Sequence, residues 1–353
     1  MQISLSRTNL GAMTPYCCVV ILAGAILCWA LKLWRADLAV PFCYNGDQFN
    51  NLMIVKGIID NALYLHNDFV GAPHGLDMHA YPFAANLDLG IMKLIALCTS
   101  DCARVINLYF LLTFPLTAAI AYGVFRRLSI SVPLAMAGSL LYCFLPYHML
   151  RGEHHLFIAS YFTIPLIVLV VIRLFRTPND QWGVTSDADR ATLHASRTTL
   201  RGVGAILSCV LVTSAMPYYP VFACYLLLIA GIALALHRRK FQPLGSALFF
   251  VAVIVVALMA NLVPTLVAWS GRPGKLAVTR HADEAEWNGM KVAQLLLPIS
   301  GHRVPILREW KEAYNENSPL VNENDASSLG IIGSAGFLIL IGRLLRFHSP
   351  PGQ

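Results

Sequence analysis

Residues 243–269 read PLGSALFFVAVIVVALMANLVPTLVAW and contain no charged side chain. A helix of about 20 apolar residues crosses the hydrocarbon core of a bilayer, so this run is long enough to span a membrane. The whole chain has the same character: 57% of its residues are hydrophobic and 13% are charged, with a mean hydropathy of +0.60. A water-soluble protein carries roughly twice that charged fraction. The sequence therefore predicts an all-α, polytopic membrane protein.

Seven further apolar runs resemble this one, which gives about eight transmembrane helices. Pro217-Tyr-Tyr-Pro220 separates two of the runs, and because proline lacks a backbone donor and ends a helix, residues 202–236 are predicted to form a helical hairpin. We expect residues 1–347 to form a single transmembrane domain, followed by a short tail at 348–353. The eight predicted spans are residues 15–34, 104–125, 131–148, 156–175, 202–216, 218–236, 243–269 and 329–342.

The first run is interpreted as a retained membrane anchor. Lys32 and Arg35 close it, and no cleavage site of small residues follows it. A cleaved secretory signal is the alternative interpretation.

Short loops on one side of the eight-span scheme are rich in arginine and lysine. Such residues collect on the cytoplasmic side of membrane proteins. The other loops, 35–103, 149–155 and 270–328, are then predicted to face out, since long loops cross the membrane largely regardless of their charge. The basic residues that set the orientation are Arg126, Arg127, Arg173, Arg176, Arg190, Arg197, Arg201, Arg238, Arg239, Lys240, Arg343 and Arg346.

The first outer loop is predicted to contain two amphipathic helices, at residues 48–64 and 84–98, that lie along the membrane surface. Residues 87–98 are the only candidate for a ninth span. That span would be about 12 residues long, would contain Lys93, and would place every basic short loop outside, so we favour the interfacial helix.

Asp47 follows the first span within the stretch CYNGDQFNN, residues 43–51. Its position directly before a predicted helix is typical of a capping residue, which accepts hydrogen bonds from free backbone N–H groups. A catalytic carboxylate at the outer surface of the membrane is the second interpretation, and the sequence alone leaves both open.

A second polar group lies in the short loop Arg151-Gly-Glu-His-His155. Glu153 with His155, or with His154, has the oxygen and imidazole ligands that suit a divalent cation. Arg280 in the last outer loop is a candidate phosphate clamp, because a guanidinium binds two phosphate oxygens at once. Solvated loop residues without a ligand are the alternative in each case.

The polar residues also argue against several classes of protein. The span interiors contain no Asp, Glu, Lys or Arg, whereas ion-coupled transporters carry ionisable groups near the middle of the membrane. The formal charge of +7 comes from lysines and arginines that set the orientation of the chain in the membrane, so no nucleic-acid partner is expected. The nine cysteines show no zinc-type spacing, and one disulfide among Cys43, Cys98 and Cys102 is left open.

This layout resembles the GT-C superfamily of membrane glycosyltransferases, which use sugars linked to lipid phosphates. Members have a catalytic acid in a long first outer loop with two interfacial helices, and the oligosaccharyltransferase branch has a second acidic motif after the third span. Asp47 occupies the first position and Glu153, beside His154 and His155, the second. The Gly46-Asp47 pair before an amphipathic helix is also similar to large bacterial membrane proteins of the YfhO type.

The resemblance implies transfer of a sugar from a polyprenyl-phosphate donor, at the outer face of a bacterial inner membrane. Asp47 would be the base of an inverting displacement, with Glu153 as the second catalytic acid. A divalent metal, Mg or Mn, would be held by Asp47, Glu153 and His155. The predicted substrate contacts are Arg151, Arg280, His79 and Tyr218. A non-catalytic translocase of lipid or polysaccharide and a membrane scaffold are the competing interpretations.

Overall fold

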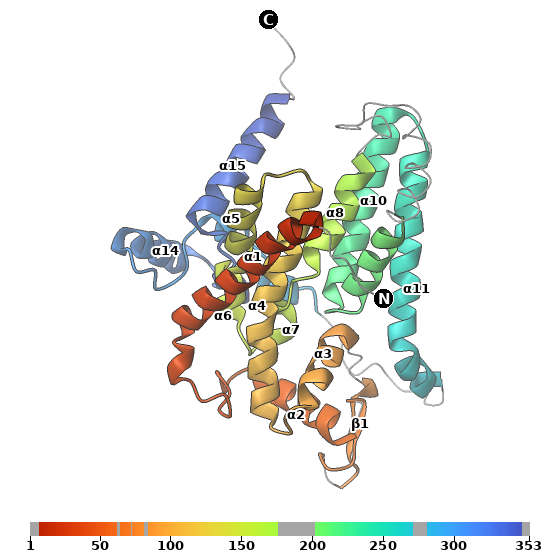
Figure 1. Cartoon of the computed structure of the whole chain (residues 1–353), viewed down its shortest axis with the longest axis vertical. Helices are drawn as coiled ribbons and strands as arrows, with labels where there is room; N and C mark the ends of the chain where they lie inside the picture. Colours follow the sequence, from red (N-terminus) through yellow and green to blue (C-terminus); the bar gives the residue numbers. More distant parts are fainter. Residues whose placement is uncertain are drawn as a thin grey trace, which may run out of the picture. The chain divides into compact units, whose positions relative to one another are not determined.

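The computed structural model describes residues 7–61, 64–71, 73–80, 84–175, 202–270 and 281–347. These residues are mostly helical (Figure 1). Within them the only sheet is a two-stranded antiparallel ribbon, β1 (His66–Asn67) and β2 (Leu76–Asp77), in which His66 pairs with Asp77. The fold is therefore all-α, as the sequence predicts.

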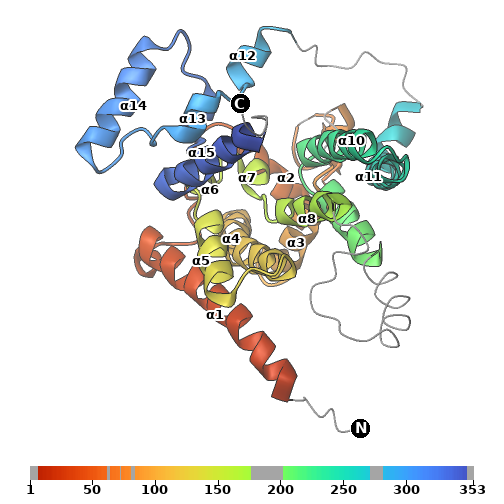
Figure 2. The same ribbon diagram turned by 90° about the horizontal axis from the view of Figure 1, so that it is seen from above.

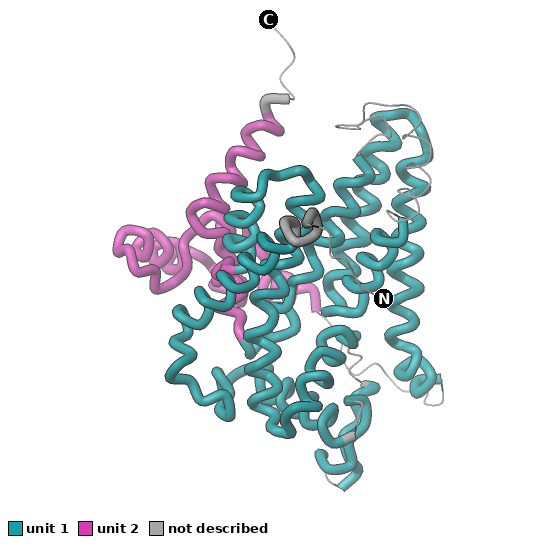
Figure 3. The backbone as a smooth tube through the Cα atoms, viewed as in Figure 1, with its two compact units in different colours: residues 1–143, 153–275 teal, residues 144–152, 276–353 magenta. Residues whose placement is uncertain are grey.

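The chain divides into two compact units, which Figure 3 shows in different colours. Unit 1 comprises residues 1–143 and 153–275, and unit 2 comprises residues 144–152 and 276–353. The single transmembrane domain expected over residues 1–347 stays a prediction. All nine cysteines are free, so no disulfide joins Cys43, Cys98 or Cys102.

Five helical segments of the described residues are long and apolar enough to cross a membrane. The three other predicted spans correspond to shorter apolar helices, so a membrane-embedded helical protein is supported while the count of eight spans is not established. The long segments are Met13–Leu31, Cys102–Arg127, Val132–Arg151, Tyr218–Arg238 and Gln242–Ser270, and the short helices are Ile164–Phe175, Gly202–Thr213 and Gly330–Leu345.

Two of the predicted spans are interrupted. Residues 156–175 form α7 (Leu156–Ala159) and α8 (Ile164–Phe175), with non-helical backbone at residues 160–163 between them. Pro165 lies in the first turn of α8, where its missing N–H is not needed.

The predicted span 131–148 is interrupted in the same way, between α5 (Val132–Cys143) and α6 (Pro146–Arg151). Leu145 has an extended ψ of 139°, because the ring of the following proline excludes helical geometry at that residue. Hydropathy cannot detect either break.

Helix packing in unit 1 forms two neighbouring groups (Figure 2). In one, α4 (Cys102–Arg127) contacts α1 (Arg7–Leu31) and α5. In the other, α8, the helix Gly202–Thr213, α10 (Tyr218–Arg238) and α11 (Gln242–Ser270) share one apolar core. The buried residues of that core are Ile167, Val170, Ala205, Cys209, Val212, Ala223, Leu227, Ala247 and Ile254.

The helical hairpin predicted around Pro217 is confirmed. The first arm ends at Thr213 and α10 begins at Tyr218, and both arms contribute to the shared core.

Both helices predicted in the first outer loop are present, as α2 (Gln48–Asn61) and α3 (Asn86–Ala96), and both pack against α4. Each buries an apolar face, which includes Ile54 and Ile58 of α2 and Met92 of α3. Their orientation along a membrane stays a prediction. The short helices η1 (Leu33–Arg35) and η2 (Met78–Ala80) complete the loop.

Unit 2 contains α6, four helices in the loop that the sequence left without structure, and α15, which corresponds to the predicted span 329–342. Within it, the start of α15 is fastened to α13, because Leu329 N donates to Leu295 O at 2.9 Å. A buried Lys311 of α14 lies 2.6 Å from Asp325. The helices are α12 (Glu284–Asn288), α13 (Val292–Leu296), α14 (Pro305–Asn317), η3 (Glu323–Ala326) and α15 (Gly330–Phe347).

Candidate functional site

The turn that leads into α2 places the Asp47 side chain in solvent. Gly46 has a φ of +55°, a left-handed conformation that glycine adopts without strain. The carbonyl of Asp47 accepts the first helical bond, from Asn51 N at 2.9 Å. The Asp47 side chain is 69% exposed, and its Oδ2 lies 3.4 Å from Nδ1 of His155.

Asp47 therefore stands at the position of a helix cap while its carboxylate contacts an imidazole. In the described part of α2, no backbone N–H donates to that carboxylate. A solvent-exposed carboxylate within reach of an imidazole is an arrangement suited to general acid–base catalysis.

The two histidines lie together against the same turn. The ring centroids of His154 and His155 are 4.7 Å apart. A Cβ atom added to Gly46 would lie 3.8 Å from Cβ of His154, which shows how closely the two backbone segments approach. The structure thus brings Asp47 together with the loop that the sequence singled out, although the two are over 100 residues apart in the chain.

Glu153 has quite different surroundings, with only 2% of the residue exposed. Its Oε2 accepts hydrogen bonds from Phe42 N at 3.0 Å and from Gln48 Nε2 at 3.1 Å. Asn51 Nδ2 donates to the backbone carbonyl of Glu153 at 3.0 Å. These bonds fix residues 153–155 to the first turn of α2, and so determine where His155 meets Asp47.

Gln48 and Asn51 were not predicted to be part of this site. The available signal is their spacing of three residues, which places both side chains on one face of α2. Both are buried, and a buried amide requires a polar partner. Sequence periodicity shows that the face is polar, but it does not name the partner.

Burial raises the pKa of Glu153 from 4.5 to about 7, because the charged form loses its hydration. The backbone N–H groups of Phe42 and Cys43 oppose this and lower the pKa. The second carboxylate oxygen, Oε1, is buried without a hydrogen-bond partner. Glu153 therefore titrates near neutral pH.

The three predicted metal ligands do not come together as a metal site. Among the residues that the structure describes, no group of three His, Cys, Asp or Glu side chains is arranged to hold a metal ion. Asp47 meets His155, but the Glu153 carboxylate is directed to Phe42 and Gln48. This donor set does not fit the predicted Mg or Mn ion.

The predicted substrate contacts have other partners in the structure. Arg151 belongs to unit 2, where it is buried and donates to Asn324 Oδ1 at 2.9 Å, with Glu323 at 3.6 Å. His79 binds α11: its carbonyl accepts from Trp269 Nε1 at 2.9 Å, and its Nδ1 lies 3.4 Å from Thr265 Oγ1. Tyr218 is the exposed first residue of α10, and Arg280 lies outside the described residues.

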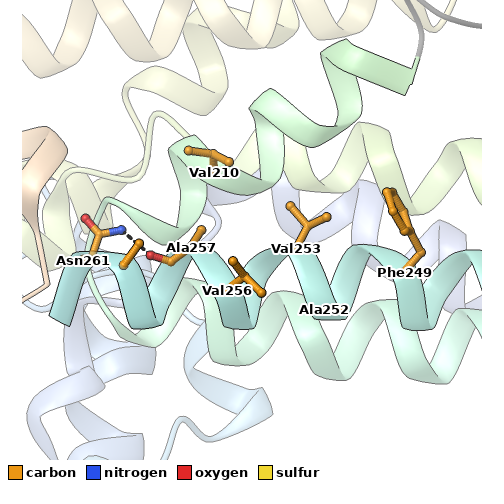
Figure 4. A pocket seen from close by; sticks show the side chains of 8 residues that line it. Val210, Phe249, Ala252, Val253, Val256, Ala257 and Asn261 are labelled. Carbon is orange, nitrogen blue, oxygen red and sulfur yellow. Dashed lines mark hydrogen bonds between the residues drawn. The ribbon is translucent and has the colours of Figure 1, made fainter. Parts of the chain in front are cut away.

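A shallow groove of about 500 Å³ runs along α11 beside the helix Gly202–Thr213 (Figure 4). The only polar residue in its lining is Asn261, which donates to Ala257 O at 2.8 Å and to Ser214 Oγ at 3.2 Å. Asn86 of the first outer loop donates to Oδ1 of Asn261 at 2.8 Å. The groove suits a hydrocarbon chain. Its lining residues are Val210, Phe249, Ala252, Val253, Val256, Ala257, Ala260 and Asn261.

Comparison of the chain with models of protein families, with curated proteins and with solved structures finds no match. No relative therefore supplies a function by analogy. The functional inference depends on the side chains around Asp47 and on the apolar character of the surrounding helices.

Proposed function

We propose that this protein is a membrane glycosyltransferase of the GT-C kind, which transfers a sugar from a polyprenyl-phosphate donor at the outer face of the membrane. The observation that carries the proposal is the exposed Asp47 carboxylate at 3.4 Å from His155 Nδ1. The pair follows the first membrane helix and the buried Glu153 fixes its geometry. The bacterial inner membrane is the proposed location.

In the proposed reaction Asp47 accepts the proton of an acceptor hydroxyl as the hydroxyl oxygen attacks C1 of the sugar. The bond between C1 and the phosphate oxygen breaks, and the polyprenyl phosphate leaves with the electron pair. A lipid phosphate is already a good leaving group, so a base and a fixed geometry matter more than a strong acid. One displacement of this kind inverts the configuration at C1.

His155 has a supporting role in this scheme. Its Nδ1 lies on the Oδ2 side of Asp47, where a protonated imidazole would hold the carboxylate in one orientation and leave Oδ1 for the acceptor. Its position depends on Glu153, to which we assign a positioning role in place of the catalytic role that the sequence suggested. Glu153 is buried and already hydrogen-bonded, so it does not present its carboxylate to a substrate in solvent.

The positive charge that neutralises the departing phosphate is assigned to Arg280 on sequence grounds alone. Arg151 is a weaker candidate, because its guanidinium is engaged by Asn324 and Glu323. An arginine that already pairs with a carboxylate must give up that contact before it binds a phosphate.

The test is transfer of labelled sugar by the full chain in proteoliposomes, with polyprenyl-phosphate mannose, glucose and arabinose as donors. We expect Asp47→Asn to lower turnover by about a hundredfold or more, the usual contribution of a general base. Asp37→Asn is the matched control, since Asp37 is an exposed acid in the same loop. Wild-type protein that transfers none of the sugars, or an active Asp47→Asn variant, would contradict the proposal.

A non-catalytic lipid translocase is the second candidate, and the apolar groove beside α11 favours it. A translocase moves the intact labelled donor between leaflets and does not need a base. The same proteoliposomes therefore separate the two candidates: translocation that Asp47→Asn leaves unchanged, without sugar transfer, would support the translocase.

A further inference from the structure

A second buried carboxyl group lies away from Asp47, in the first turn of α3. The Asp88 side chain has no exposed surface. Its Oδ1 contacts the hydroxyl of Tyr109 on α4, and that hydroxyl lies 3.0 Å from Ser160 Oγ. Ser160, in the break between α7 and α8, donates to Leu156 O at 2.9 Å.

These contacts require more hydrogens than the two hydroxyl groups possess. Three hydrogen-bond contacts join four oxygens in a row: Asp88 to Tyr109, Tyr109 to Ser160, and Ser160 to Leu156. A tyrosine and a serine each carry one hydroxyl hydrogen. If Asp88 is ionised, one contact therefore has no hydrogen. If Asp88 is protonated, it donates to Tyr109, Tyr109 donates to Ser160, and Ser160 donates to Leu156.

The surroundings of Asp88 also favour its neutral form. In the described part of the chain no lysine, arginine or histidine pairs with it, and its Oδ2 is buried without a hydrogen-bond partner. Burial raises the pKa of Asp88 from 3.8 to about 7, and the Tyr109 hydroxyl opposes the shift by stabilising the charged form.

Several other polar groups of the packed elements have partners of their own, while Thr163 Oγ1, in the same break as Ser160, is buried without one. Tyr219 of α10, which acts electrostatically on Tyr109, donates its hydroxyl hydrogen to Ile158 O. On α2, Lys56 pairs with Asp60 at 2.8 Å. Lys93 of α3 donates to Ile58 O at 2.6 Å. Tyr109 is therefore the side chain that contacts the Asp88 carboxyl group, beside the backbone N–H of Asp88 itself.

We propose that Asp88, Tyr109 and Ser160 form a proton-binding site, in which uptake of one proton by Asp88 completes a row of hydrogen bonds from α3 through α4 to the break between α7 and α8. The ligand is the proton itself. The site differs from the proposed catalytic pair and does not depend on it. The last acceptor of the row, the carbonyl of Leu156, directly follows His155 in the chain. The protonation state of Asp88 is therefore linked to the segment that carries both histidines.

Infrared spectroscopy of the purified full chain in lipid nanodiscs tests this proposal, because a protonated carboxyl group has a C=O stretching band that a carboxylate lacks. A pH titration of the wild type should show two buried carboxyl groups that ionise near neutral pH, Glu153 and Asp88. Asp88→Asn should remove one band and Glu153→Gln the other. Asp60→Asn is the control, since Asp60 pairs with Lys56 and should contribute neither band.

Two further variants distinguish the hydrogen-bonded row from a merely buried acid. Tyr109→Phe removes the donor that stabilises the carboxylate, and hydrogen bonds to charged groups are the stronger ones, so the Asp88 midpoint should move to higher pH. Ser160→Ala removes two contacts from the protonated form and one from the ionised form, so the midpoint should move to lower pH. Spectra without an Asp88 band, or shifts of both variants in the same direction, would overturn the proposal.

Discussion

Asp47 and Glu153 are carboxyl groups at one junction with opposite surroundings, and their chemistry follows from that difference. Asp47 is largely exposed, so water stabilises its charge and a substrate in solvent can reach it. Glu153 is almost fully buried and receives hydrogen bonds from Phe42 and Gln48. The hydrogen bonds of Glu153 fix the local structure. Because burial raises its pKa, ionisation of Glu153 lowers the free energy of unfolding.

The raised pKa of Glu153 predicts that the stability of the folded chain depends on pH. The folded pKa of about 7 lies above the ordinary value of 4.5, so the folded state binds the extra proton between these values. Stability from this group is then fully present below about pH 4.5 and is lost as the pH rises through 7. At 1.36 kcal/mol per pKa unit the loss is roughly 3 kcal/mol.

Glu153→Gln keeps the shape of the side chain and cannot ionise, so it should flatten the loss of stability between pH 5 and 8. Thermal unfolding of the purified chain at several pH values measures this. Glu309→Gln, at an exposed position of α14, should keep the wild-type profile. A Glu153→Gln profile as steep as the wild type would mean that Glu153 does not titrate in this range.

At the scale of elements, the length and spacing of apolar residues predicted the helices. They did not predict breaks within helices or which helix faces contact each other. The helices α2 and α3 follow from the apolar spacing within residues 48–64 and 84–98. The breaks before Pro146 and at residues 160–163 were missed, because hydropathy averages over a window and ignores backbone geometry. The contact of Asp88 with Tyr109 was missed because it joins faces of two separate helices.

Packing of α10 on α11 gives a prediction at the same scale. A Cβ atom added at Gly231 would lie 2.5 Å from Cβ of Ala247, so the two helices approach too closely for a side chain at this point. Gly231→Ala should therefore destabilise the chain by about 1–3 kcal/mol, as overpacking does.

Gly245→Ala is the matched control, because a Cβ there would meet only Phe241 at an ordinary 3.7 Å. It should be neutral or mildly stabilising, since alanine favours a helix over glycine. The readout is the thermal stability of the two purified variants in detergent. Equal stability of both variants would show that the helices adjust their distance freely.

At the scale of the whole molecule, the two units carry different parts of the polar chemistry. Unit 1 contains both the Asp47–His155 pair and the Asp88 row. Unit 2 contains Arg151 and the buried Lys311 with Asp325. Orientation toward a membrane is a property of the whole chain, set by the arginines and lysines of short loops, and it decides on which side the proposed reaction occurs.

The last prediction concerns this orientation. A maleimide that does not cross membranes should label the exposed native Cys98 from outside, because residues 35–103 are predicted to face out. Cys98→Ser should lose that label. Lys240→Cys, in the basic segment after α10, should become reactive only after the membrane is opened. Outside labelling at position 240 with protection of Cys98 would reverse the topology and would place Asp47 and His155 on the cytoplasmic side, where an outer-face transferase cannot work.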